Sequence, residues 1–209
     1  MRGDAQTPER RYWPNFLRGE PREIHARLLE NDPLRLRERC AVRLRARWIL
    51  IEPDRAFARS AACAALCAAQ DQPPPDLEKW AIACIDKAFE QILASDRAAE
   101  LAGDPPDEEQ RTFPLLTDCL MVAPERVRSV ALAFQALEDP VRRAFFELLV
   151  EGREVLQVLQ EGPWVDADQL HDHTHASLRV FGHNPPPRTR SLVSIYPKSA
   201  KAPGPDNPS

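Results

Sequence analysis

Apolar side chains recur along the chain at spacings of three and four residues, which is the pattern of amphipathic helices. The most hydrophobic example predicts a long helix from about Leu77 to Leu101, after a proline-rich break. Other helices are predicted to begin near Pro21 and Pro53 and to span about 33–51. Alternation of β-branched and aromatic residues is almost absent, so the sequence predicts an all-α fold.

The pattern from Pro124 to Phe181 predicts three or four short helices separated by tight breaks. Proline suits a first helical turn, so we expect Pro124 to begin one helix, and Asp139 to cap the next with Pro140 at its first position. Gly152 is expected to end that second helix. Helix-turn-helix units are built from short helices joined in this way.

Polar and proline-rich stretches divide the chain into modules. The acidic stretch GDPPDEEQRT is typical of a linker, and the small and proline residues near the C-terminus bury too little apolar surface to offset ordering. We therefore expect two small helical modules. The predicted organisation is an N-terminal arm (1–19), a helical domain (20–102), a linker with a short apolar segment (103–123), a helix-turn-helix-like domain (124–182) and a disordered tail (183–209).

The stretch LEDPVRRAFFELLVEGREV is similar to the start of region 4 of bacterial RNA polymerase sigma factors, the extracytoplasmic-function type especially, and the likeness extends over 137–181. That family shows a Leu-Pro-x-x-x-Arg pattern, an apolar helix and a Glu-Gly break before its helix-turn-helix. The matching residues are Leu137, Pro140, Arg142, Arg143, Phe145, Leu148, Glu151 and Gly152. A fainter resemblance to region 2 lies at 53–101, on Trp80, Ala83, Ile85 and Asp86.

The resemblance implies a DNA-binding transcription initiation protein. Its C-terminal helix-turn-helix would read a promoter, and its N-terminal helices would contact the RNA polymerase core. The arginines that would position DNA phosphates are Arg126, Arg128, Arg142, Arg143 and Arg153. The residues that would face the groove of the DNA are His171, His173 and His175.

The last predicted helix favours a different interpretation. Where the family usually has a recognition helix rich in Arg, Lys, Ser and Thr, this chain has Asp166, Asp168 and Asp172 among its histidines. Carboxylates repel phosphate, and phosphate contacts supply most of the affinity in DNA binding. The alternative is a non-enzymatic helical protein–protein interaction or regulatory module that has lost DNA binding. A net acidic exposed face over 166–181 in the folded protein would favour this alternative.

Charge is spread unevenly along the chain. Residues 1–60 contain fourteen Arg and no Lys against nine carboxylates, whereas the whole chain has a formal net charge of −4. A basic segment can indicate nucleic-acid binding. Arg and Glu can also line solvated helix faces, and we favour this second interpretation.

His171 and His175 stand four residues apart, the spacing that zinc-binding helices use. No third ligand and no general base accompany them, so we expect no metal and no cofactor. The sequence also has no glycine-rich phosphate loop and no Gly-x-Ser-x-Gly nucleophile elbow. We therefore predict that the protein is not an enzyme.

The five cysteines lie inside apolar helical stripes. An odd number of cysteines without a secretory signal favours a reducing cytoplasm over a disulfide framework. No stretch reaches the roughly 18 apolar residues that a membrane span needs, so we expect no membrane partner.

Overall fold

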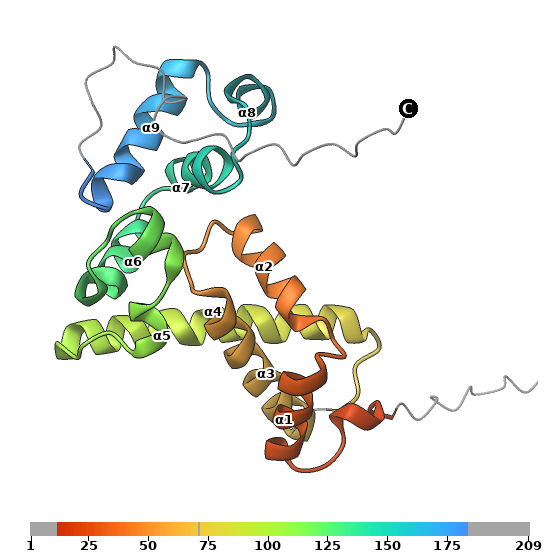
Figure 1. The fold of residues 1–209 in the computed structure, drawn as a ribbon. Helices are drawn as coiled ribbons and strands as arrows, with labels where there is room; N and C mark the ends of the chain where they lie inside the picture. The colour runs from red at the N-terminus through yellow and green to blue at the C-terminus, as the bar shows by residue number, and fades with distance from the viewer. Residues whose placement is uncertain (1–11, 71, 184–209) are drawn as a thin grey trace, which may run out of the picture.

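The computed structural model describes residues 12–70 and 72–183, and within these ranges the chain is helical and has no strands. The described part of the chain forms nine α-helices joined by turns (Figure 1). The all-α prediction is confirmed. Except for His183, the predicted tail lies outside the described residues, as does most of the predicted N-terminal arm.

Helix α4 (Leu77–Ala102) is the longest element and runs across the molecule as a single rod (Figure 1). The Asp76 carboxylate caps it by accepting from the backbone N–H groups of Glu78 and Lys79 at 3.0 and 3.1 Å. Gly103 ends it in the left-handed conformation with φ of 75°. The predicted helix from about Leu77 to Leu101 is therefore confirmed.

Three helices pack with α4 to form the first hydrophobic core: α1 (Pro21–Asn31), α2 (Leu36–Ala46) and α3 (Pro53–Gln70). Their predicted beginnings at Pro21 and Pro53 are confirmed. The buried face of α3 is rich in alanine, and it contacts α4 more extensively than any other pair of helices in the described chain. Small side chains let the two helix axes approach closely.

The helix predicted over 33–51 is shorter than expected, because α2 covers only Leu36–Ala46. The helix begins three residues later than predicted, and the Asp32 carboxylate accepts from the Leu36 backbone N–H at its start, at 2.6 Å. After Ala46 the chain leaves the helix, and Trp48 adopts the left-handed conformation with φ of 50°. The extended stretch that follows carries Leu50 into a different core from that of α2.

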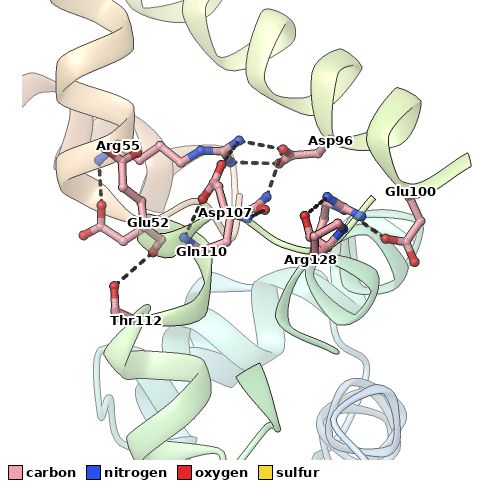
Figure 2. Close-up of polar contacts among 10 residues, drawn as sticks. Glu52, Arg55, Asp96, Glu100, Asp107, Gln110, Thr112 and Arg128 are labelled. Atoms are coloured by element: carbon pink, nitrogen blue, oxygen red, sulfur yellow. Dashed lines mark hydrogen bonds and ion pairs between the residues drawn. The ribbon is translucent and has the colours of Figure 1, made fainter. Parts of the chain in front are cut away.

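The predicted linker is partly structured. It contains α5 (Glu108–Arg111), which Asp107 and Gln110 begin with a reciprocal capping box. The Gln110 side-chain amide also donates to Asp96 on α4 at 2.9 Å (Figure 2). The apolar segment after α5 contains one turn of π-helix, η2 (Leu115–Cys119). The segment joins the second core through buried Phe113, Leu116, Leu120 and Val122.

The C-terminal part contains α6 (Val127–Gln135), α7 (Asp139–Phe145), α8 (Val155–Glu161) and α9 (Ala167–Val180). A 3₁₀ turn that begins at Pro124 leads into α6, as the proline predicted. Helix α7 starts at Asp139, with Glu138 at the cap position. It therefore begins one residue earlier than predicted. The second core gathers α6, α7 and α9, and a small third core lies where α8 meets α7 and α9.

Candidate nucleic-acid interface

Helices α7, α8 and α9 form the unit in which the sequence places DNA recognition (Figure 1). Helix α7 continues through a wide turn, η4 (Phe146–Val150), and the chain then bends at Gly152, whose φ is 63°. Helix α9 packs on α7, and the Phe145 ring lies 5.1 Å from that of Phe181 and 4.9 Å from that of Phe134. The short α8 lies between α7 and α9 in sequence and contacts α9.

The turn between α8 and α9 is built around a buried tryptophan. The Trp164 indole N–H donates to Nδ1 of His173 at 2.9 Å, and the ring packs in the third core. A Cβ atom on Gly162 would lie 1.9 Å from this ring, so only glycine fits there. Asp166 begins α9 by accepting from the Gln169 backbone N–H at 2.8 Å. These contacts fix the entry into the last helix.

Two of the predicted phosphate-binding arginines are engaged by carboxylates of their own module. Arg143 donates to Glu147 at 2.6 Å, and Arg153 forms ion pairs with Glu147 at 3.3 Å and with Glu161 at 2.5 Å. The Glu161 hydrogen bond raises the pKa of Arg153, and the Arg153 guanidinium in turn lowers the pKa of Glu161. Binding a DNA phosphate with either arginine would compete with these internal pairs.

Arg128 is buried, with 5% of its surface exposed. It donates to Glu100 on α4 at 2.9 Å and to the backbone carbonyl of Pro105 at 3.1 Å, and it also bonds the Asp104 carbonyl (Figure 2). A phosphate group on the molecular surface does not reach it. The structure therefore places Arg128 against the end of α4, which the sequence alone does not reveal.

Arg142 pairs with Asp139 one turn earlier, and only 11% of its side chain is exposed. Arg126 is exposed at the end of the 3₁₀ turn before α6. The structure therefore does not bring the five predicted arginines together on one surface.

The three histidines of α9 do not form an exposed row. His175 is buried, with 8% of its surface exposed, and its ring centroid lies 3.7 Å from that of His171. His173 accepts the hydrogen bond from Trp164 and is half-buried. The structure thus places His175 on the buried side of α9, whereas the sequence placed it on the exposed side. Its position on the inner face of the helix follows from Leu170, Thr174 and Leu178, which are buried around it.

The exposed face of α9 and its N-cap is acidic. Asp166, Asp168 and Asp172 are exposed there, and Arg179 is the exposed basic residue over the same stretch. Counting these groups gives three negative charges against one positive charge. A helix with this face repels the phosphate backbone that a recognition helix must approach.

The arginines of the N-terminal segment are also neutralised by carboxylates, which come from other helices. Arg43 and Arg47 both bind Asp86 on α4, at 2.7 and 3.1 Å, and Arg39 binds Glu78 at 2.7 Å. These three arginines of residues 1–60 thus help to hold α2 against α4.

Two exposed apolar side chains near the helix-turn-helix-like unit were not singled out in the sequence. Leu156 on α8 is 75% exposed, and Val165 in the turn before α9 is 89% exposed. Their neighbour Val155 is 39% exposed. The helical spacing of apolar residues in α8 does not reveal that Val158 is its buried residue, that Leu159 packs only partly on the third core and that Leu156 is exposed.

Among the described residues, no three His, Cys, Asp or Glu side chains are placed to hold a metal ion together. None of the helices in the described ranges combines the length and the apolar character of a membrane span. In comparisons with known proteins, the chain matches no family model, no curated protein and no solved structure.

Proposed function

We propose that this chain is a non-enzymatic regulatory protein that works through protein–protein contacts made by its C-terminal helices and does not read DNA with α9. The partner implied by the resemblance to sigma factors is the RNA polymerase core. The helical modules then present an outer surface that contacts a protein partner in place of DNA.

The acidic exposed face of α9 is the observation that carries this proposal. Asp166, Asp168 and Asp172 occupy the N-terminal half of the helix, which in a helix-turn-helix enters the major groove. Exposed Leu156 and Val165 lie on α8 and in the turn before α9, and exposed apolar side chains favour contact with protein over contact with a phosphate backbone. The arginines of the unit support the same conclusion, because Arg143 and Arg153 are held by internal carboxylates.

A second candidate function is promoter binding by a sigma-factor-like initiation protein. The observation in its favour is the order of the last helices, in which a short α8 and a tight turn precede the longer α9, packed on α7. Exposed Arg126 and Arg179 would then be the available phosphate contacts.

The test is capture of purified bacterial RNA polymerase core by the purified chain, beside a salt titration of binding to random duplex DNA. The variant Leu156→Ser/Val165→Ser removes both exposed apolar side chains. Leu101→Ser is the matched control, because Leu101 is 90% exposed at the far end of α4. Such surface substitutions change stability by only about 0.5 kcal/mol, so all variants are expected to fold.

We expect the wild type and Leu101→Ser to capture the polymerase core, and the double variant to lose at least tenfold in affinity. Binding to random DNA is expected to be absent even at low salt. DNA affinity that falls steeply with salt, and that weakens in an Arg126→Ala/Arg179→Ala variant, would contradict the proposal and support promoter binding. Capture that is equal in all variants would also contradict it.

A further inference from the structure

Three buried cysteines gather where α3 packs on α4. Cys63 and Cys67 lie one turn apart on α3, and Cys84 lies on α4. All three are free thiols of the first core, with exposed surface fractions of 4%, 9% and 2%. The alanine-rich face of α3 lets the two helices approach closely, so thiols from both helices meet in one cluster.

One edge of this cluster reaches the surface and is positively charged. The exposed Lys87 of α4 places its Nζ 3.8 Å from the Sγ of Cys67 as a hydrogen-bond donor. Arg59, which is exposed one turn before Cys63 on α3, adds a second positive charge. Cys67 keeps more exposed surface than the other two thiols. A small neutral solute therefore reaches the cluster from this edge.

The cluster favours a thiolate at Cys63. Hydrogen bonds from the Cys84 and Cys67 thiols lower the pKa of Cys63 to about 6. The charges of Lys87 and Arg59 act in the same direction, and burial acts against them. The hydrogen bond with Cys63 and burial raise the pKa of Cys84, which stays a neutral thiol. The thiolate is the nucleophilic form of cysteine, and positive surroundings of this kind are typical of reactive thiols.

Helix geometry selects which two thiols can join. Side chains four residues apart on one helix have Cβ atoms about 5–6 Å apart, whereas a disulfide needs about 3.5–4.5 Å. A bond between Cys63 and Cys67 would therefore distort α3. A bond between Cys63 and Cys84 joins two separate helices, whose side chains meet without a change inside either helix. The hydrogen bond between these two thiols is the contact from which such a disulfide forms.

We propose that hydrogen peroxide converts Cys63 and Cys84 into a disulfide that joins α3 to α4. The Cys63 thiolate attacks one oxygen of the peroxide: an S–O bond forms, the O–O bond breaks, and hydroxide leaves and takes a proton from solvent. The Cys84 sulfur then attacks the resulting sulfenic acid: the S–S bond forms, the S–O bond breaks, and the thiol proton leaves with the hydroxide as water. Two electrons pass from the thiols to the peroxide. The inference goes beyond the proposed function, because it concerns the N-terminal helices.

The test treats the reduced full chain with hydrogen peroxide at pH 7, removes the excess with catalase, and alkylates the remaining thiols after denaturation. Trypsin then releases the peptide 60–79 with Cys63 and Cys67, and the peptide 80–87 with Cys84. We expect mass spectrometry to find these two peptides linked, and fragmentation to find Cys67 alkylated. The link should be absent before peroxide is added and after reduction with dithiothreitol.

Single substitutions assign the roles within the cluster. Cys63→Ser and Cys84→Ser are each expected to abolish the link, whereas Cys67→Ser should retain it. Cys40→Ser is the matched control and should leave the rate unchanged, since Cys40 is a buried thiol of the same core whose pKa burial raises to about 11. Lys87→Gln removes the positive charge at the edge and should slow the formation of the link at least threefold.

A link between Cys63 and Cys84 in the wild type that forms more slowly in Lys87→Gln would support the proposal. Two peptides that stay unlinked while the exposed Cys119 becomes oxidised would overturn it, because the oxidant was then active. A link that fragmentation assigns to Cys67, a link that survives in Cys63→Ser, or a rate that Lys87→Gln leaves unchanged would also overturn it. If a variant does not fold, the peptide map of the wild type decides alone.

Discussion

At the scale of single residues, the most deeply buried ion pair of the described chain joins Arg55 on α3 to Asp96 on α4 (Figure 2). Their side chains are 15% and 11% exposed, and the two hydrogen bonds between them measure 2.6 and 2.9 Å. Gln110 donates a third hydrogen bond to the same carboxylate. Since a buried charge is tolerated only when it is paired, each member depends on the others.

We expect Asp96→Asn to lower the free energy of unfolding by about 3 kcal/mol, because it leaves the Arg55 charge buried without its main counter-ion. Urea denaturation monitored by circular dichroism measures this change. Glu38→Gln is the control: its ion pair with Arg35 has both side chains more than half exposed, and the loss there should be below about 1 kcal/mol. Equal losses in the two variants would contradict the role given to burial.

The sequence shows which residues are charged, but it does not predict which of them form ion pairs within the folded protein. The partner of Arg55 is 41 positions away, and that of Arg43 is 43 positions away, so no local pattern connects them. The resemblance to sigma factors implies that Arg128 contacts DNA phosphates. Its burial depends on the packing of α6 against α4, which is a tertiary contact.

At the scale of elements, helix starts were predicted better than helix ends. Pro21, Pro53 and Asp76 are local signals, because a proline or a capping carboxylate acts within one turn. The end of α2 at Ala46 has no such signal, and the apolar residues that follow continue a helical spacing. Beyond the helix end, Ile49 and Leu50 enter two different cores, which a continuous helix would not allow for adjacent residues in this arrangement.

The Asp86 carboxylate on α4 forms ion pairs with Arg43 and Arg47, and the effect of protonating it can be tested. The hydrogen bond from Arg43 holds the pKa of Asp86 below its usual value of 3.8. A group whose pKa is depressed by folding stabilises the fold above its unfolded pKa, and this contribution disappears as the pH falls through the folded pKa. Stability should therefore fall between pH 4 and the lower pKa of the folded state.

In Asp86→Asn this part of the pH dependence should be absent, and the variant should already be less stable than the wild type at pH 7. Urea denaturation at a series of pH values measures the slope. In an Arg43→Met/Arg47→Met background, where the guanidinium partners are removed, Asp86→Asn should have a much smaller effect. A slope that Asp86→Asn leaves unchanged would show that other carboxylates cause the acid loss.

At the scale of the whole molecule, two features join the helical halves. Arg128 in the second half binds Glu100 and two carbonyls at the end of α4, and Leu50 of the first half lies in the second core. The sequence predicted two helical modules joined by a polar segment, but it did not predict these crossing contacts. The acidic character of the outer face of α9 was visible in the sequence, whereas the burial of His175 required the structure.

We expect Arg128→Met to destabilise the contact between α4 and α6, because the buried Arg128 side chain no longer donates to Glu100 and to the carbonyls of Asp104 and Pro105. The free energy of unfolding should fall by about 2–3 kcal/mol. Hydrogen exchange at the amides of α6 should accelerate more than exchange at the amides of α3. Arg126→Met changes an exposed arginine two residues earlier and should leave both rates unchanged. A uniform acceleration across all helices would argue against a local role at the junction.

The crossing of Leu50 into the second core has a consequence for synthesis on the ribosome. The chain emerges from its N-terminus, so the residues of α1 to α4 are available to fold before the later helices exist. Leu50 and the half-buried Trp48 nevertheless belong to the second core, together with Phe134, Phe145 and Phe181, which are translated much later. The nascent first half therefore leaves these two apolar side chains uncovered until the helices of the second core have been made.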